Sequence, residues 1–155
     1  VAMLVRDGRT VWSTAVGVQD LQSRVPMSDR SLFRIYSMTK PVTAVAVMML
    51  AEQGRFRLDD PVKAYLPEFE NVVVRVEGGA TRPPARPVTV RDLLLHTSGL
   101  EHRTAAIYRD AQVRSRSIPL PQFIRNIAAV PLMEDPGTRF RYSEATTVLG
   151  RLVEV

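Results

Sequence analysis

The chain lacks cysteine, has few lysines and has no long apolar run, and each absence excludes a class of structure or chemistry. With 0 cysteines among 155 residues, disulfides, thiol nucleophiles and thiolate metal sites are all excluded. The longest apolar run, residues 42 to 51, is too short to cross a bilayer, so no membrane partner is expected. The net charge of +5 comes from scattered arginines that form neither a charge block nor a basic stripe. Nucleic acid is therefore not an expected partner.

What remains is an ordinary composition, with 45% hydrophobic and 24% charged residues. A chain of 155 residues is long enough for one domain with a sizeable core. It begins within a strand-like segment and stops within a helix-like segment that has no capping signal. We therefore expect it to be a piece of a longer protein, and its compartment stays open.

Local patterns predict the main elements. Strand-like residues on both sides of Asp7-Gly8 predict a β-hairpin. Residues 39 to 53 predict a helix buried on most sides, which starts close to Ser37 because Pro41 fits only a first turn and which ends at Gly54. The remaining expectations are a short strand or an approach segment at 32 to 36, an exposed loop at 75 to 87, a helix capped by Thr89 and Asp92 through residue 95, and helices at 121 to 130 and 144 to 155.

Ser37 and Lys40 are the first candidates for chemistry. Three residues apart at a helix start, they lie on one face, where a neutral lysine can take the proton of a serine. The backbone N–H of Ser37 would also lie at the positive end of the helix, where it suits an oxyanion. The alternative is a helix N-cap followed by a solvated lysine. The use of lysine in an arginine-rich chain favours proton transfer, because arginine cannot be deprotonated in a protein.

Tyr142 is the second candidate, since a phenol near cations ionises more readily and can act as a general base. Alternatively, Tyr142 packs at a helix entrance with Ser143 as the N-cap. The two histidines offer less: His96 follows a short helix, where a structural role is expected, and His102 does not share a helix face with it. No His-Glu-x-x-His pattern occurs, so no metal site is expected.

Four ordered motifs carry a family resemblance: Ser37-Met-Thr-Lys40-Pro41, Leu58-Asp-Asp-Pro-Val62 with Leu66-Pro-Glu-Phe69, Val88 to Leu100 ending in His-Thr-Ser-Gly-Leu, and Pro136-Gly-Thr-Arg-Phe-Arg-Tyr-Ser143. In this order they resemble the serine β-lactamase-like hydrolases, in the branch of class C β-lactamases and family VIII carboxylesterases. The resemblance implies an α+β fold, with an antiparallel sheet flanked by helices plus a mainly helical lobe. Residues 1–54 would contribute the hairpin and nucleophile helix, residues 55–155 would form the helical lobe, and the C-terminal part of the fold would be missing.

The resemblance also implies roles for matching residues. Ser37 would be the acylated nucleophile, and its N–H would supply half of the oxyanion hole. Lys40 would be its proton partner, and Tyr142 would act as general base with Lys40 and help protonate the leaving group. Neither a cofactor nor a metal is implied.

Two departures from the family pattern shape the expected function. Glu144 stands where the family has a substrate-binding asparagine, and a carboxylate can neither donate that hydrogen bond nor favour an anionic β-lactam. Glu144 therefore favours ester substrates and, beside Lys40, would place the base role on Tyr142. The family's third motif, a Lys-Thr-Gly-like strand that would bring the second oxyanion donor, is absent.

The sequence thus predicts a serine carboxylesterase that acts on a small-molecule ester and needs a complementary C-terminal segment of the same protein. Without that segment, open sheet edges and apolar helix faces would lie exposed. The alternatives are a β-lactamase, a D-amino-acid peptidase or an acyl transferase on the same scaffold, or a non-catalytic fragment.

Overall fold

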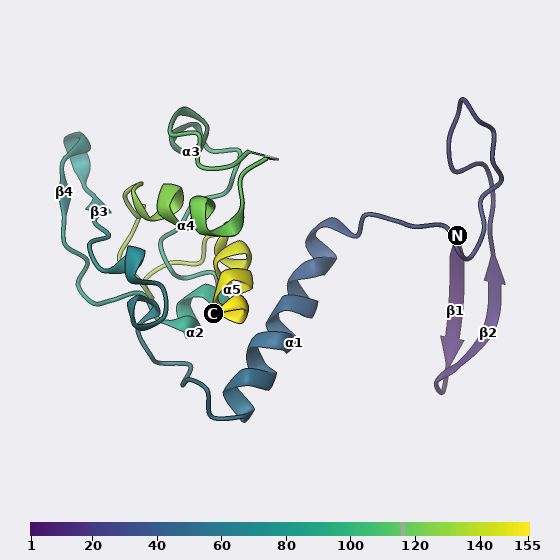
Figure 1. Cartoon of the computed structure of the whole chain (residues 1–155), viewed down its shortest axis with the longest axis horizontal. Helices are drawn as coiled ribbons and strands as arrows, with labels where there is room; N and C mark the ends of the chain where they lie inside the picture. Colours follow the sequence, from purple (N-terminus) through teal and green to yellow (C-terminus); the bar gives the residue numbers. More distant parts are fainter. Residues whose placement is uncertain (116) are drawn as a thin grey trace. The chain divides into compact units, whose positions relative to one another are not determined.

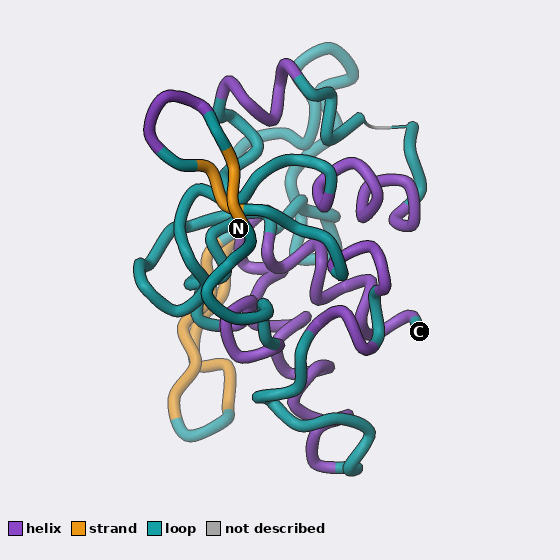
Figure 2. Tube along the Cα trace, turned by 90° about the vertical axis from the view of Figure 1, so that its left-hand side faces the viewer, coloured by secondary structure: helices purple, strands orange, loops and turns teal. Residues whose placement is uncertain are grey.

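The computed structural model describes residues 1–115 and 117–155, which form two units, Val1–Ser37 and Met38–Val155 (Figure 1). Helices and loops make up most of the chain, and strands occupy only short parts of it (Figure 2). Among the described residues, no helix combines the length and apolar character needed to span a membrane.

The first unit is built on the predicted hairpin. Strands β1 (Ala2–Arg6) and β2 (Arg9–Thr14) pair antiparallel, with Leu4 opposite Trp12. Asp7 and Gly8 have φ values of 49° and 74°, and positive φ at both central residues is what a tight hairpin turn requires. In the described segment 32–36 no strand forms. Tyr36 has a φ of 46°, which a strand cannot accommodate, and it begins the short 3₁₀ turn η1 (Tyr36–Met38).

Helix α1 (Thr39–Glu52) starts and ends as predicted. Pro41 lies in its first turn, where no intrahelical N–H is needed. At the other end, the N–H of Gly54 donates to Ala51 O at 2.9 Å and that of Arg55 donates to Leu50 O at 3.1 Å. This pair of bonds is the Schellman motif, and Gly54 supplies the left-handed φ of 69° that it needs.

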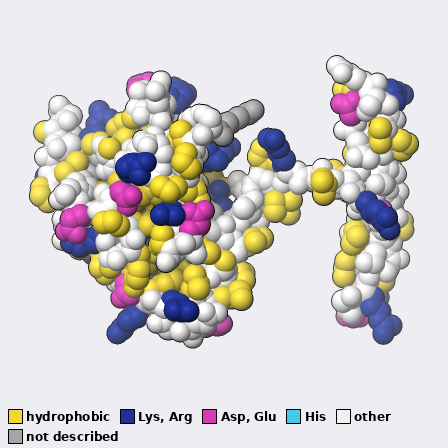
Figure 3. Space-filling model, in the orientation of Figure 1, with side chains coloured by type: hydrophobic (Ala, Val, Ile, Leu, Met, Phe, Trp, Pro, Cys, Tyr) yellow, Lys and Arg dark blue, Asp and Glu magenta, His cyan; other side chains and the backbone are white. Residues whose placement is uncertain are grey.

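The expectation that α1 is buried on most sides is wrong for this chain. Among its described residues only Val47 is fully buried, and the helix packs on one side against α5 (Ala145–Glu154). Val42, Val45 and Met49 are 63%, 58% and 53% exposed. The second unit leaves this apolar surface uncovered, and Figure 3 shows many apolar side chains at the surface.

The remaining elements of the second unit lie between α1 and α5 in the chain. In chain order they are η2 (Val62–Ala64), η3 (Pro67–Phe69), β3 (Val74–Arg75), η4 (Glu77–Gly79), β4 (Thr81–Arg82), α2 (Val90–Leu94), α3 (Ala106–Asp110) and α4 (Leu120–Ala128). The predicted loop at 75 to 87 contains a two-residue pairing of β3 with β4, whereas α4 and α5 lie where the sequence predicts helices. Helix α5 contacts α1, α2 and α4, and it buries Val148, Leu149 and Leu152 among them.

Helix α2 carries the predicted capping box, in which Thr89 Oγ1 accepts from the Asp92 N–H and Asp92 accepts from the Thr89 N–H. Asp92 is buried and also binds the Arg86 guanidinium through both oxygens, at 2.6 and 2.8 Å. It accepts from the Thr97 hydroxyl at 3.1 Å as well. Although burial alone raises the pKa of Asp92, the hydrogen bonds from Arg86 and Thr89 outweigh it and hold that pKa below its ordinary value. One carboxylate thus joins the start of α2 to the turn that follows the helix.

Candidate active site

Lys40 and Tyr142, two of the three residues assigned to catalysis from the sequence, lie together. Lys40 is in the first turn of α1, and its Nζ is 4.6 Å from the centre of the Tyr142 ring. This distance is typical of a cation–π contact. Ser37, the third residue, is the last residue of the first unit and lies in η1, which directly precedes α1.

Tyr142 is held by a backbone ladder between segments 96–101 and 133–144. Its four bonds run from Met133 N–H to Gly99 O (2.8 Å), Gly137 N–H to Thr97 O (2.7 Å), Arg141 N–H to His96 O (2.7 Å) and Glu144 N–H to Glu101 O (3.2 Å). The approach is so close that a Cβ on Gly99 would lie 2.3 Å from Glu134 O. Gly99 also has a φ of 80°, so only glycine fits this point of the ladder.

Ion pairs reinforce the ladder just before Tyr142. Arg141 Nε donates to Glu134 Oε2 at 3.0 Å, its Nη2 donates to Glu134 Oε1, and its Nη1 donates to Glu101 Oε2 at 2.8 Å. The hydrogen bonds that Arg141 donates to Glu134, together with the charge of Glu101, raise the pKa of Arg141. The residue that precedes Tyr142 is therefore anchored to both segments of the ladder.

His96 contacts the Tyr142 ring directly. The two rings stack with their centres 5.0 Å apart and an angle of 28° between their planes, and the His102 ring lies 5.9 Å away. His96 Nδ1 accepts the Ser143 backbone N–H at 3.2 Å and lies 3.3 Å from the Ser143 hydroxyl. The pKa of His96 is lowered because burial disfavours a charged ring and the Lys40 cation repels one. From the sequence, His96 was expected to have a structural role at a helix end. The contact with Tyr142 had no local signal apart from the family motif that begins at His96.

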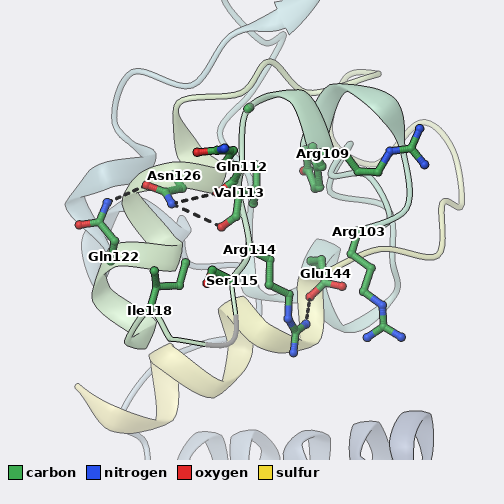
Figure 4. A pocket seen from close by; sticks show the side chains of 12 residues that line it. Arg103, Arg109, Gln112, Val113, Arg114, Ser115, Ile118, Gln122, Asn126 and Glu144 are labelled. Atoms are coloured by element: carbon green, nitrogen blue, oxygen red, sulfur yellow. Dashed lines mark hydrogen bonds and ion pairs between the residues drawn. The ribbon is translucent and has the colours of Figure 1, made fainter.

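Glu144 precedes α5 and is 6% exposed. Its Oε2 accepts from Arg114 Nη1 at 2.7 Å (Figure 4). It also accepts from the Thr147 hydroxyl at 2.9 Å. Arg114 therefore offsets the negative charge of Glu144. Sequence patterns could not reveal Arg114 as the partner of Glu144, because it lies 30 positions earlier.

Glu144 also lines a cavity of about 740 Å³. Among the other residues of its wall are Arg103, Tyr108 and Arg114, and Figure 4 shows Arg114 pointing to the carboxylate of Glu144. Among the described residues, no three His, Asp or Glu side chains lie close enough together to hold a metal ion.

The whole chain resembles known proteins in sequence and in structure. A family model described as Beta-lactamase matches residues 1–155. Esterase EstB of Burkholderia gladioli is 36% identical over 162 residues, which cover 99% of this chain and 40% of that protein. Protein Rv1367c of Mycobacterium tuberculosis is 35% identical, with coverage of 99% and 40%. The solved structure of "EstCE1, a hydrolase with promiscuous acyltransferase activity" has a TM-score of 0.84 at 34% identity and covers 98% of this chain.

The chain spans about 40% of the length of each of these three relatives. The predicted fold is confirmed as part of a β-lactamase/transpeptidase-like α+β fold, with helices and small antiparallel sheets.

Proposed function

Because this chain belongs to the Beta-lactamase family, we propose that the full-length protein cleaves carboxylic esters through an acyl-enzyme on Ser37. The family is one of serine hydrolases, and the relatives include one named an esterase and one titled a hydrolase. The observation that carries the proposal is the approach of Lys40 Nζ to the Tyr142 ring. This places an amine beside a phenol, the pair that would move the proton of Ser37.

In the proposed reaction, Tyr142 acts as a phenolate that the Lys40 cation stabilises. The phenolate takes the Ser37 hydroxyl proton as the serine oxygen attacks the ester carbonyl carbon. The carbonyl becomes an oxyanion, to which the Ser37 N–H donates from the start of α1. When the oxyanion collapses, the ester C–O bond breaks and the alcohol leaves with the proton from Tyr142. Water then repeats the sequence on the acyl-enzyme and releases the acid.

We further propose that a complementary C-terminal segment completes the site. Two observations support this: the chain covers about 40% of EstB, and α1 leaves Val42, Val45 and Met49 largely exposed. The segment would cover that apolar face and supply the second oxyanion donor. The proposed domain division at residues 54 and 55 belongs to this arrangement, in which α1 would join the part built on the sheet.

Glu144 is proposed as a substrate-binding residue that favours esters, because it lacks the amide donor that a β-lactam side chain would use. Its pairing with Arg114 offsets its charge, so the missing donor is the stronger argument against β-lactam substrates.

Acyl transfer is a second candidate, because EstCE1 is titled a hydrolase with promiscuous acyltransferase activity. In that reaction an alcohol replaces water in the second step. Adding a primary alcohol to an ester assay would then increase release of the first alcohol while free acid falls.

The test uses the full-length protein with a p-nitrophenyl short-chain ester, with nitrocefin as the competing substrate. We expect ester turnover that Ser37→Ala abolishes, and a fluorophosphonate adduct on Ser37. Lys40→Ala should lower turnover by about 100-fold or more, as the loss of a proton-transfer group does. The matched control is Lys63→Ala, because Lys63 forms an exposed ion pair with Glu70 and should be dispensable. Faster turnover of nitrocefin than of the ester would overturn the ester assignment, and absence of the adduct would favour a non-catalytic role.

A further inference from the structure

Tyr142 does not lie in a helix, so its orientation depends on the groups around it. It lies in the irregular segment before α5 and is 41% exposed, so helix packing does not fix its ring. A general base must nevertheless stay within hydrogen-bond reach of the proton that it takes. Some neighbouring group therefore has to hold the ring in place.

His96 contacts three consecutive residues centred on Tyr142. Its carbonyl accepts the Arg141 N–H at 2.7 Å, its ring stacks on Tyr142 at 5.0 Å, and its Nδ1 accepts the Ser143 N–H at 3.2 Å. The backbone is thus fixed on both sides of Tyr142 while the ring rests on an aromatic surface.

These contacts require a neutral imidazole. Nδ1 can accept the Ser143 N–H only when it carries no proton, which leaves the proton on Nε2. The Phe140 and Tyr142 rings and the Ser143 hydroxyl contact the imidazole, and the nearby Lys40 cation disfavours a second positive charge on it. Burial acts in the same direction and lowers the pKa of His96.

We propose that His96 is a positioning residue that orients the Tyr142 phenol through the Ser143 N–H and the ring stack. This inference rests on the proposed role of Tyr142 and assigns His96 no contact with the substrate. It predicts that changes at His96 lower kcat and leave KM nearly constant, because misplacing a catalytic group slows the reaction and does not weaken substrate binding.

The experiment compares His96→Asn with His96→Gln in the full-length protein. The Asn oxygen can take the place of Nδ1, and asparagine tolerates the φ of 56° found at this position. The Gln oxygen lies one methylene further out and cannot take that place. Rates are expressed per active site titrated with fluorophosphonate, so unfolded protein does not count.

We expect kcat per titrated site to fall about 100-fold in His96→Gln and about tenfold or less in His96→Asn, with KM within about twofold in both. His102→Ala is the control, because the His102 Nδ1 pairs with Thr104 in its own loop, and its loss of kcat should be much smaller than that of His96→Gln. A kcat in His96→Gln within about threefold of the wild type, or equal losses in the Asn and Gln variants, would overturn the proposal.

A second readout separates this proposal from the proposed function. If the wild type takes no label at Ser37, the hydrolase assignment fails, and ¹³C-tyrosine NMR then decides the positioning role. The Tyr142 resonance, assigned with Tyr142→Phe, should shift or broaden in His96→Gln and stay close to wild type in His96→Asn. An unchanged resonance in His96→Gln would refute the role of His96 without reference to activity.

Discussion

Gly99→Ala should break the backbone ladder at its tightest point. The new Cβ would lie 2.3 Å from Glu134 O and 3.1 Å from Leu132 Cβ, so the two segments would have to separate. That shift would weaken the bond from Met133 N–H to Gly99 O, which is 2.8 Å long. Alanine would in addition be strained at the φ of 80°.

The expected loss of stability is the sum of three effects. Left-handed strain costs about 1 to 2 kcal/mol, forced separation of packed groups about 1 to 3 kcal/mol, and a weakened buried hydrogen bond about 1 kcal/mol. Gly99→Ala should therefore lower the free energy of unfolding by about 3 to 6 kcal/mol, which corresponds to a fall in Tm of roughly 10 °C.

Thermal unfolding followed by circular dichroism measures this change in the full-length protein. Gly150→Ala is the matched control, because Gly150 lies within α5, has no positive φ, and a Cβ there would meet nothing within 4 Å. It should stabilise the protein by up to about 1 kcal/mol. A loss below about 1 kcal/mol in Gly99→Ala would show that the ladder yields easily and would refute this reasoning.

Three further changes test the electrostatics around the site. Asp92→Asn should lower the free energy of unfolding by about 2 kcal/mol, because it removes a charged partner of Arg86. The fold lowers the pKa of Asp92, so the stability that its carboxylate contributes should be lost only as the pH falls below the ordinary value of 3.8. Urea unfolding of the wild type and the variant at pH 7 and pH 3 measures both effects. Arg114→Ala should lower the free energy of unfolding by about 2 kcal/mol, because it leaves the buried Glu144 carboxylate without its cation. Adding Glu144→Gln to this variant should restore part of the lost stability. If the double variant is no more stable than Arg114→Ala, the two residues are not energetically coupled. The fold lowers the pKa of His96, so the unfolded chain binds a proton more readily, and the free energy of unfolding should fall as the pH drops below 6.5. In His96→Asn this dependence of stability on pH should be weaker. An unchanged pH dependence would mean that another group causes it.

Elements that depend on a few neighbouring residues could be predicted from the sequence. The Asp7-Gly8 turn needs positive φ at two adjacent positions, and Gly54 ends α1 through bonds within its last turn. The box of Thr89 and Asp92 spans four positions. In each case the residues that determine the geometry lie next to one another in the chain, so local chemistry was sufficient.

Contacts between distant segments could not be predicted in the same way. The family motifs pointed to Lys40 and Tyr142, but no local pattern indicates that His96 stacks on Tyr142 or that Arg114 binds Glu144. The contact between His96 and Tyr142 forms because the ladder brings the segment after α2 against the segment before α5, whereas Arg114 reaches Glu144 from the segment after α3. The exposed side of α1 is a second example. Its hydrophobic residues indicate a surface suited to burial, but they do not indicate which element would pack against it.

The ladder relies on main-chain amides and carbonyls, and this has a consequence for protein engineering. Amide and carbonyl groups are the same at every position other than proline, so side chains along the segment can change while its register is kept. Arg139 and Phe140 are largely solvent-exposed and do not donate their amides to the four ladder bonds. The Phe140 ring lies 6.0 Å from the His96 ring, so a library is better randomised at Arg139 alone, with proline omitted. It would vary the chemistry beside the site while the phenol three residues later keeps its place.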